Sequence, residues 1–558
     1  MRGLGFRHDS KLSYSRTAHY TEIDEPLPRP PAEEFQGAAW DTIKKHPHLF
    51  QTHTPIDPDK LKDLLSDHPN KSFVDSVITV LKEGLWPWAN TKPTENFPET
   101  WDNSWAPLPS DSEQEFINNQ CEAEVEAQRH SPAFGPDLLP GMYSTPNIAV
   151  PKPRSEALRL VANQSAGEYC QNNMIDRDQT RGARMDTLLV FIPLLLAFAR
   201  AHPEEKLVLW KSDVANAFRL VPIHPLWQIK QVVTAGMPTK DEVKKNLWNF
   251  DQLCRYVDWC ACFGNCGSPR AWASVMGLVI WIAIFIYNIL LLCCYIDDCY
   301  SVALAKDLDY YEPYSCWMPR EQVILLRLWD HLGIPHKAPK QVWGTPLMVI
   351  GFLVDPNALT ATLPSDSKTD IINHAREFAA SRRRTLHEWQ QLTGWMNWSF
   401  NVFPLLRPSL SNVYSKMSGK SEPSALIYIN KAVRTELEWF ANHVEISSGV
   451  FFFATIDWNP DTEADLTIYC DACLEGMGIW VPGDNLGLIC TTDPSCPLSN
   501  IIFYWEALTV LAAIEWSTSS PLLAGHSVEN PLRLTIHSDN MNTVNVFSSL
   551  SAQPEYNP

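Results

Sequence analysis

The chain of 558 residues is long enough for roughly three or four ordinary domains, and its 45% hydrophobic content is ample for buried cores, which excludes a disordered protein. A formal net charge of −19 argues against a uniformly basic nucleic-acid-binding protein, because phosphate groups are bound by Lys and Arg. The charge is uneven, however: residues 1–140 carry a net −10, residues 141–420 a net +5 and residues 421–558 a net −14. Only the middle segment has the basic character that favours a nucleic acid as partner.

The 14 cysteines are scattered along the chain, and the N-terminal sequence MRGLG is followed by polar residues rather than by an apolar secretory segment. We therefore expect an intracellular protein, cytoplasmic, nuclear or both. Cys254, Cys260, Cys262 and Cys266 lie close together in the sequence. They lack the paired spacing of a zinc site and have no completing histidine, so buried free thiols are the favoured interpretation over zinc.

In chain order, residues 1–140 are rich in proline and polar side chains and contain one convincing helix, at about residues 73–83, which predicts a partly ordered acidic leader. Strand-like and helix-like segments then alternate to about residue 355, and a mainly helical segment follows. A second alternating pattern begins at Leu466. These patterns predict three domains after the leader, at residues 141–365, 366–450 and 451–558.

Residues 271–296 contain no charged side chain and are long enough to span a membrane, so a membrane-anchored protein is one alternative. Ser268-Pro269 is a helix-start signal, and Asp297-Asp298 ends the run where lipid headgroups would otherwise lie. A buried helix at about 270–286 that leads into a buried strand at about 289–296 explains the run better, and we expect no membrane partner.

Three aspartates are expected at neighbouring strand ends. The sequence LVLWKSD is typical of a strand that ends in Asp213, and a second apolar strand ends just before Asp297 and Asp298, after which the chain returns at residues 299–304. Adjacent acids in a hairpin turn point to opposite faces, so at least one of the pair can face Asp213. Like charges that are buried together require a cation, and hard oxygen ligands select Mg²⁺ or Mn²⁺.

Two such ions, about 3.5–4 Å apart, can activate a primer 3′-hydroxyl and stabilise the leaving pyrophosphate, which is the reaction of a polymerase. An isolated Asp-Asp pair is more often a solvated turn. Here apolar strands flank the pair on both sides, where a carboxylate pair without a metal would be hard to explain.

Tyr295-Ile296-Asp297-Asp298 resembles the Y-x-D-D signature of reverse transcriptases, and KSDVANAF at residues 211–218 is similar to the first aspartate motif of that family. The resemblance implies that Asp213, Asp297 and Asp298 are the catalytic, metal-binding residues. It also places Phe218 at the steric gate that favours deoxynucleotides, although a core aromatic residue is an equal alternative.

Two further segments match family motifs for template and primer. FGNCGSP at residues 263–269 resembles the motif that packs under the template and the incoming nucleotide, and the pair at residues 351–352 resembles the primer-grip turn. The resemblance implies five residues in contact with template or primer: Gly264, Ser268, Pro269, Gly351 and Phe352. The family usually has Gln where Phe263 stands, which puts one hydrogen bond to the nucleotide in doubt.

The resemblance also implies three basic ligands for the nucleotide. Lys152 and Arg159 lie in a segment similar to the fingers, and Lys340 lies in a segment similar to the motif whose lysine protonates pyrophosphate. Phosphate oxygens favour such donors, although any single Lys or Arg is more often a solvated surface charge. Asn163 stands where the family commonly has an acidic residue. Residues 385–404 resemble the thumb and connection helices, or else form an ordinary Trp-rich helix pair.

In the last domain, Asp471 ends one predicted strand, Asp539 follows another, and Glu506 lies early in a helix, so the three carboxylates could converge on a metal ion. The arrangement is similar to ribonuclease H, with these residues at the first three acidic positions of that family. The fourth acidic position has no counterpart before Pro558. A ribonuclease H-like fold that is kept for packing, without cleavage, is therefore a serious alternative.

Taken together, the resemblance implies an α+β protein: a right-hand polymerase with fingers, palm and thumb, followed by a C-terminally incomplete ribonuclease H-like domain. It implies an RNA-directed and DNA-directed DNA polymerase of a retrotransposon, with RNA and DNA template–primer and deoxynucleoside triphosphates as partners. Ser538-Asp539-Asn540, followed by a helix-like segment, is closer to DIRS-type (tyrosine-recombinase) elements than to retroviruses. The alternative is a decayed or host-adapted remnant that binds nucleic acid without polymerising.

Overall fold

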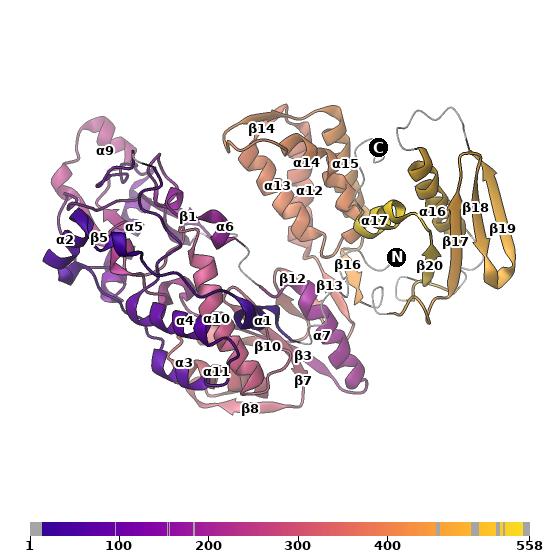
Figure 1. Ribbon diagram of the computed structural model, residues 1–558, viewed down its shortest axis with the longest axis horizontal. Helices are drawn as coiled ribbons and strands as arrows, with labels where there is room; N and C mark the ends of the chain where they lie inside the picture. The colour runs from indigo at the N-terminus through magenta and orange to yellow at the C-terminus, as the bar shows by residue number, and fades with distance from the viewer. Residues whose placement is uncertain are drawn as a thin grey trace. The chain divides into compact units, whose positions relative to one another are not determined.

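The computed structural model describes residues 14–550, apart from residues 95, 153, 154, 156, 182–184, 454–457, 493–500, 520–524, 528 and 529. Helices and strands are mixed along the chain (Figure 1), in agreement with the predicted α+β class. The chain divides into two compact units. The first unit contains the described residues up to 191 and residues 210–343, and the second unit contains residues 192–209 and the described residues from 344 onward.

The described residues up to 140 form helices that belong to the first unit, where the sequence predicted a partly ordered leader. These helices are α1 (Arg16–Ile23), α2 (Gly37–Lys45), α3 (Pro58–Leu64), α4 (Lys71–Glu83) and α5 (Asp111–Glu126). Helix α4 is the one predicted, and the Asn70 side chain caps it by accepting a hydrogen bond from Phe73 N. Backbone hydrogen bonds from Leu85 to Pro222 and from Asp57 to Leu332 join this segment to later parts of the chain. The prolines and polar residues of this segment gave little indication of the side chains that these helices bury.

The central sheet of the first unit has the strand order β10-β3-β7-β6. Its strands are β3 (Leu207–Asp213), β6 (Cys293–Tyr295), β7 (Asp298–Leu304) and β10 (Val342–Gly344). Strands β6 and β7 form an antiparallel hairpin in which Tyr295 pairs with Asp298. The apolar residues that begin β3 are buried, as the sequence predicted for a core strand.

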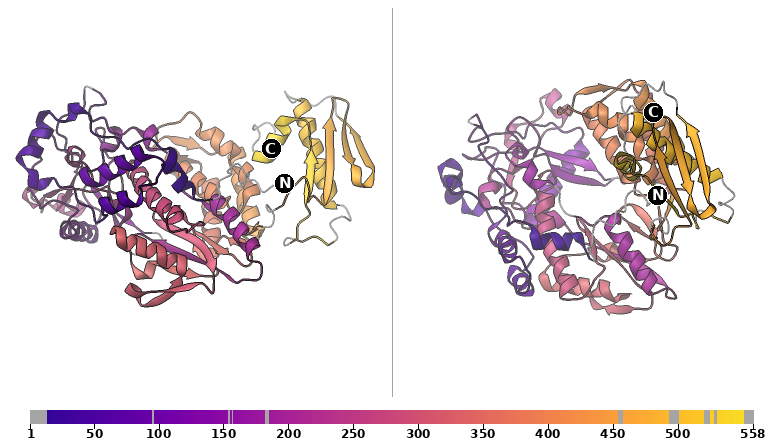
Figure 2. Two further views of the ribbon diagram at one scale, coloured as in Figure 1. Left: turned by 60° about the horizontal axis from the view of Figure 1, so that its bottom comes forward. Right: turned by 45° about the vertical axis from the view of Figure 1, so that its right-hand side comes forward.

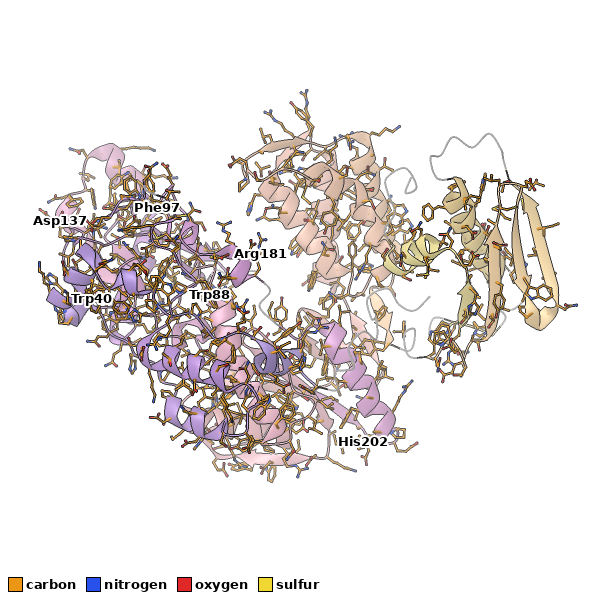
Figure 3. All side chains as sticks on the ribbon, viewed as in Figure 1. Trp40, Trp88, Phe97, Asp137, Arg181 and His202 are labelled. Carbon is orange, nitrogen blue, oxygen red and sulfur yellow. The ribbon has the colours of Figure 1, made fainter. Side chains whose placement is uncertain are left out.

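Helix α10 (Ser268–Phe285) accounts for most of the uncharged run, and β6 begins only at Cys293. Pro269 lies in the first turn of the helix, where its missing N–H has no intrahelical partner to lose. Among the described residues, α10 is the helix that is long and apolar enough to cross a membrane, and it is mostly buried within the protein. Such burial is typical of a core helix. The side chains around it are drawn in Figure 3.

The first unit also contains three antiparallel strand pairs and several short helices. They are β1 (Asn147–Pro151) with β2 (Leu158–Ala162), β4 (Val232–Ala235) with β5 (Cys254–Val257), β8 (Leu308–Tyr311) with β9 (Cys316–Pro319), α6 (Arg177–Thr180), α8 (Pro225–Gln228), α9 (Lys240–Lys245) and α11 (Arg320–Leu332).

The described cysteines are free thiols. Burial raises the pKa of the Cys260 and Cys262 thiols to about 12.

The second unit begins with part of α7 (Leu188–Ala201) and continues as a small sheet and a group of helices. The sheet has the order β11-β12-β13-β16, formed by β11 (Leu347–Val349), β12 (Phe352–Asp355), β13 (Thr360–Thr362) and β16 (Val450–Phe452). The helices are α12 (Ser365–Ala380), α13 (Leu386–Ser399), α14 (Ser411–Met417) and α15 (Lys431–Ile446), with the strand pair β14 (Arg383–Thr385) and β15 (Leu426–Tyr428). Thr385 and Glu388 form a capping box that starts α13.

The last part of the second unit is a four-stranded sheet with the order β19-β18-β17-β20, whose strands are labelled in Figure 1. Figure 2 shows the same sheet from two further directions, at the yellow end of the colour scale. Its elements are β17 (Leu466–Ala472), β18 (Gly476–Val481), β19 (Leu486–Thr491), α16 (Ile501–Ser519), β20 (Leu534–His537) and α17 (Met541–Ser549). Ile468 of β17 and Val510 and Ala513 of α16 belong to one buried core, so the helix covers one face of the sheet. Strands β17 and β20 are parallel, with Tyr469 opposite His537. Parallel pairing places the residues that follow both strands at the same edge.

Candidate active site

Asp213, Asp297 and Asp298 lie at one corner of the central sheet, which we call the acidic corner. Strand β3 ends at Asp213 and is the neighbour of β7, which begins at Asp298. The backbone N–H of Val214 donates to the carbonyl oxygen of Asp297 at 3.3 Å. The structure therefore brings together three residues from two chain segments that are more than eighty residues apart, as the strand-end pattern predicted.

The hairpin turn of the acidic corner is held in an unusual conformation. Ile296 has a φ of 60°, a left-handed value that a β-branched residue rarely adopts, and it occupies the first position of the two-residue turn between Tyr295 and Asp298. The indole Nε1–H of Trp272, a fully buried residue of α10, donates to the carbonyl oxygen of Ile296 at 2.7 Å. This bond holds the peptide group that immediately precedes Asp297.

The charges at the acidic corner are only partly balanced. Burial and the nearby carboxylates of Asp213 and Asp298 raise the pKa of Asp297 to about 6. Burial also raises the pKa of Asp298, although Lys211 opposes the shift with its Nζ 3.6 Å from Asp298 Oδ1. Lys340 Nζ lies 2.8 Å from both carboxylate oxygens of Asp213. These raised pKa values identify a corner in which additional positive charge would be stabilising.

The carboxylate oxygens of Asp213, Asp297 and Asp298 do not lie as close together as the ligands of one metal ion. Among the described residues, the acidic side chains close enough together to hold an ion are Asp471, Glu506 and Asp539, and the acidic corner is not among them. Lys340 binds both oxygens of Asp213 instead. The structure therefore supports the predicted meeting of the three aspartates in one corner, while the predicted bridging geometry around two ions stays a prediction.

The raised pKa of Asp297 has a consequence for stability in metal-free buffer. Its pKa in the folded chain, about 6, exceeds the ordinary value of 3.8, so ionisation between these values destabilises the folded state. We expect the thermal stability of the wild type in EDTA to fall relative to that of Asp297→Asn as the pH rises from about 4 to 7, by up to about 3 kcal/mol. Unfolding curves at several pH values test this; parallel pH dependences of the two proteins would contradict it.

A cleft of about 300 Å³ adjoins the acidic corner. Its lining includes the three predicted basic nucleotide ligands and one aspartate of the corner: Lys152, Arg159, Lys340 and Asp297. Lys152 and Arg159 are both exposed to solvent, so a ligand in the cleft can reach their side chains. The sequence therefore identified residues that share one cleft, although nothing in their spacing along the chain requires it.

The predicted steric-gate residue lies beneath the surface of this cleft. Phe218 belongs to a 3₁₀ turn at Ala217–Leu220, is 7% exposed and is not among the lining residues. Its ring packs against Phe263, with the ring centroids 5.0 Å apart. Phe263 is a lining residue, and the Arg159 guanidinium lies 4.9 Å from the centre of its ring. Phe263 thus forms the apolar wall that Phe218 supports and on which Arg159 rests.

Sequence reasoning missed a buried group of charges that lines the same cleft. Arg219 donates to both carboxylate oxygens of Asp258 at 2.8 Å and to Glu124 Oε2 at 2.8 Å. Burial disfavours ionisation of Glu124, but Arg219 and Arg129 hold its pKa well below the ordinary value. These ion pairs join α5 to the chain just after Phe218. Their members are scattered over more than 130 residues, so no spacing in the sequence reveals them.

The residues predicted to contact template or primer occupy tight backbone positions. Gly264 has a φ of 115°, and a Cβ there would clash with the carbonyl oxygen of Ala162, so only glycine fits. Ser268 is buried and its hydroxyl donates to Cys262 O at 2.9 Å, so it shapes the start of α10 beside Pro269.

The turn between β11 and β12, in the second unit, is equally constrained. Ile350 and Gly351 have φ values of 49° and 83°, and the Trp398 indole donates to Ile350 O at 3.3 Å. Phe352 is fully buried against Trp398, with ring centroids 4.7 Å apart. The exposed feature of this predicted primer-grip turn is therefore its backbone at Gly351 rather than the Phe352 ring.

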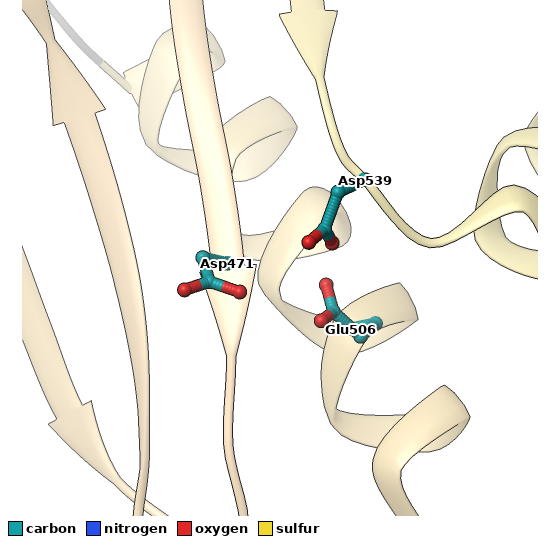
Figure 4. Close-up of side chains that lie close together, drawn as sticks. All are labelled: Asp471, Glu506 and Asp539. Atoms are coloured by element: carbon teal, nitrogen blue, oxygen red, sulfur yellow. The ribbon is translucent and has the colours of Figure 1, made fainter.

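A second acidic site lies in the C-terminal sheet. Asp471, Glu506 and Asp539 each offer an oxygen atom, and these atoms lie within 4.8 Å of one another (Figure 4). We call them the C-terminal acidic group. Asp471 and Asp539 each lie two residues beyond the paired Tyr469 and His537 on parallel strands, so the sheet register brings them to one edge. The sequence predicted this convergence from the same strand ends.

Glu506 is the buried member of this group, with 4% of its surface exposed. Its Oε1 accepts a hydrogen bond from Ala472 N at 3.3 Å, and its Oε2 is buried with no hydrogen-bond partner among the described residues. Burial, together with the charges of Asp471 and Asp539, raises the pKa of Glu506. A buried carboxylate oxygen without a donor, between two other carboxylates, fits a divalent cation, which prefers oxygen ligands.

No protein-family model matches this chain, and no curated protein matches it. Among solved structures, the chain is similar to the foamy viral protease–reverse transcriptase in complex with double-stranded DNA, with a TM-score of 0.44 and 15% sequence identity over 95% of this chain and 93% of that chain. It is also similar to the dRH form of the foamy viral protease–reverse transcriptase in complex with double-stranded DNA, with a TM-score of 0.42 and 16% identity over 89% and 77% of the two chains. At this distance, the likeness does not identify a family for the chain.

Proposed function

We propose that this protein is an RNA-directed DNA polymerase that also copies DNA, of the kind that retrotransposons encode, with fingers, palm and thumb. One observation carries the proposal: β3 and the β6–β7 hairpin bring Asp213, Asp297 and Asp298 to one corner, where burial and mutual repulsion raise the pKa of Asp297 to about 6. Lys211 and Lys340 only partly offset the negative charge. A semi-buried corner with excess carboxylate charge favours divalent cations.

The residues of the acidic corner fit Mg²⁺ or Mn²⁺, because Asp213, Asp297 and Asp298 supply only hard oxygen donors. Two ions held there would supply activation of a primer 3′-hydroxyl and stabilisation of the leaving pyrophosphate. For the aspartates to act as ligands, Lys340 must release Asp213. Lys340 lines the cleft, so its released ammonium group can donate a proton to pyrophosphate.

The remaining residues bind and orient the substrates. Lys152 and Arg159 bind the triphosphate of a deoxynucleotide, since phosphate oxygens favour charged donors. Phe263, supported by Phe218, limits the space beside the sugar. Template and primer contact the backbone at Gly264 and Gly351, so binding is largely independent of base sequence, with either RNA or DNA as template.

The test is extension of oligo(dT) on poly(rA) by the purified full-length protein, with dTTP and either Mg²⁺ or Mn²⁺. The proposal predicts incorporation that EDTA abolishes. A decayed remnant that only binds nucleic acid is the other candidate, and the departures at Phe263 and Asn163 are the observations that favour it. Retention of the same template–primer on a filter, without incorporation above the EDTA control with either metal, would establish the remnant and overturn the polymerase.

The wall residue Phe263 provides a sharper test of the nucleotide site. We expect Phe263→Gln to raise the KM for dTTP about two- to fivefold, because it removes the ring on which Arg159 rests and that Phe218 supports. Phe263→Tyr keeps the ring and is the matched control, with little expected change. Steady-state kinetics on poly(rA)/oligo(dT) measure both variants; equal KM values for Phe263→Gln and wild type would show that the Arg159–Phe263 contact is not used.

The C-terminal acidic group favours a second activity, cleavage of RNA in an RNA–DNA hybrid. The specific observation is that Asp471, Glu506 and Asp539 each offer an oxygen atom and that these atoms lie within 4.8 Å of one another. In addition, Glu506 Oε2 is buried and has no hydrogen-bond partner among the described residues. Three carboxylates that hold a divalent cation can activate a water molecule against a phosphodiester. The net charge of −14 over residues 421–558 opposes tight binding of the hybrid by this region alone.

A further inference from the structure

We propose that Asp186, acting with the N-terminal helix α1, positions the hairpin that carries Asp297 and Asp298; this inference rests on the proposed polymerase function. The Asp186 side chain is fully buried. Its Oδ1 accepts hydrogen bonds from the backbone N–H groups of Arg16 at 2.7 Å and Thr17 at 3.3 Å. Its Oδ2 accepts from the Ser15 hydroxyl at 2.5 Å and from Cys294 N at 2.9 Å. One carboxylate thus joins the start of α1 directly to the catalytic hairpin.

Asp186 takes the place of a neighbouring strand at the outer edge of the hairpin. Strand β6 is last in the order β10-β3-β7-β6, so one side of it has no strand partner. Both backbone groups of Cys294 are satisfied by Asp186: the Cys294 N–H donates to the carboxylate, and the Cys294 carbonyl accepts from Asp186 N at 2.8 Å. The Tyr300 hydroxyl of β7 donates to the Asp186 carbonyl at 2.5 Å. Asp186 therefore holds both strands of the hairpin.

Helix α1 is itself seated closely on the core. It crosses α10 at Gly277, where a Cβ would lie 2.7 Å from Thr21 Cγ2 and 3.1 Å from Thr17 O. The Thr17 hydroxyl also donates to Cys294 O at 3.3 Å. Because a side chain at position 277 would push α1 outward, the close approach of the two helices determines where α1 presents its N–H groups to Asp186.

This arrangement acts on the metal-binding aspartates through the backbone. Cys294 lies three residues before Asp297, and Trp272 fixes the intervening Ile296 carbonyl from α10. The hairpin is thus held at Cys294 by Asp186 and at Ile296 by Trp272. Ile296, which has the left-handed φ, directly precedes the two carboxylates in the chain. Loss of the Asp186 anchor would let the turn relax and move both carboxylates away from Asp213. Groups that orient metal ligands in this way commonly change metal affinity or activity by about 10- to 100-fold.

The first test is Asp186→Asn, since an amide group cannot accept hydrogen bonds at both former oxygen positions. We expect kcat for dTTP incorporation to fall about tenfold and the Mg²⁺ concentration for half-maximal rate to rise several-fold. The KM for dTTP and the Kd for template–primer should stay unchanged, because Lys152, Arg159 and the nucleic-acid contacts are untouched. A loss of folded protein alone would lower kcat and leave the Mg²⁺ dependence unchanged.

The second test moves α1 without altering any hydrogen-bonding group. Gly277→Ala places a methyl group against Thr17 and Thr21. We expect the same combination of a lower kcat and a higher Mg²⁺ concentration for half-maximal rate, with smaller changes in both. Gly394→Ala is the matched control: Gly394 is also helical, in α13, and a Cβ there meets nothing within 4 Å. It should leave both quantities unchanged. If Asp186→Asn does not fold, the comparison of Gly277→Ala with Gly394→Ala tests the positioning role instead.

The outcomes separate this inference from the proposed function. Absence of incorporation by the wild type would overturn the polymerase itself. The positioning role would be overturned if the wild type polymerises and both Asp186→Asn and Gly277→Ala show the wild-type Mg²⁺ dependence. Helix α1 and Asp186 would then contribute only to the stability of the fold. A several-fold rise in the Mg²⁺ requirement of both variants, with no change in Gly394→Ala, would establish it.

Discussion

Substitution of Asp297 by asparagine is expected to reduce primer extension by about a thousandfold, the largest effect that any single replacement in the acidic corner should have. Asp297 lies in the hairpin turn, with Asp213 and Asp298 close enough to raise its pKa to about 6. At about pH 8 the carboxyl is ionised and can bind a cation, whereas an asparagine amide supplies no charge. Steady-state dTTP incorporation on poly(rA)/oligo(dT) measures the loss.

The control for this variant is Asp309→Asn. Asp309 also lies in an antiparallel hairpin of the first unit, β8–β9, where it forms an exposed ion pair with Arg327. Removal of one exposed charge should leave incorporation within about twofold of the wild type, since such pairs contribute little to stability. Equal incorporation by Asp297→Asn and wild type would defeat the polymerase assignment.

The second large effect is expected at Glu506. Glu506→Gln should reduce cleavage of the RNA strand of an RNA–DNA hybrid by at least about a hundredfold. Glutamine keeps the volume of the side chain but brings no charge to the point where the unpartnered Glu506 oxygen lies beside Asp471 and Asp539. Extension of a primer on the same hybrid should remain unchanged, because the acidic corner is a separate site. Cleavage of an end-labelled RNA strand, followed on a sequencing gel, measures the effect.

A matched control lies in the same helix. Glu515 of α16 is exposed, so Glu515→Gln removes the same charge without touching the C-terminal acidic group. Cleavage by this variant should equal that of the wild type. Absence of cleavage by the wild type itself would contradict the proposed second activity and leave the C-terminal acidic group with a role in packing alone.

The sequence predicted the parts of the site that depend on local pattern. Strand β3 ends at Asp213, and the hairpin turn of β6 and β7 carries Asp297 and Asp298. The three aspartates meet because β7, which begins at Asp298, is the neighbour of β3. The same reasoning placed Asp471 and Asp539 at one edge, because β17 and β20 are parallel. In both cases a strand period and a polar residue at its end carry the information.

Features that depend on side-chain packing could not be predicted from the sequence. The sequence left two equal interpretations of Phe218, a steric gate at the nucleotide site and a core aromatic residue. In the structure its ring is buried and packs against Phe263, as expected for the core aromatic residue. The ion pair between Lys340 and Asp213 joins two residues that are 127 positions apart in the chain. The burial of Asp186 has no local signal, since its partners lie at residues 15–17 and 294.

The N-terminal region shows a different limit of sequence reasoning. Its prolines and polar residues indicated a partly ordered leader, yet the structure has five helices there, each with buried side chains within the first unit. Apart from α4, whose pattern predicted a helix, these helices have few buried apolar residues, so their periodicity in the sequence is weak. Contacts with distant strands and helices, rather than local propensity, stabilise them.

The central claim is that Asp213, Asp297 and Asp298 together hold divalent cations, and anomalous diffraction from crystals soaked in Mn²⁺ with template–primer and a non-hydrolysable deoxynucleotide tests it most directly. We predict anomalous peaks bounded by these three carboxylates, with Lys340 displaced from Asp213. Peaks confined to Asp471, Glu506 and Asp539, with Lys340 still bound to Asp213 in a complex that contains nucleotide, would contradict the claim.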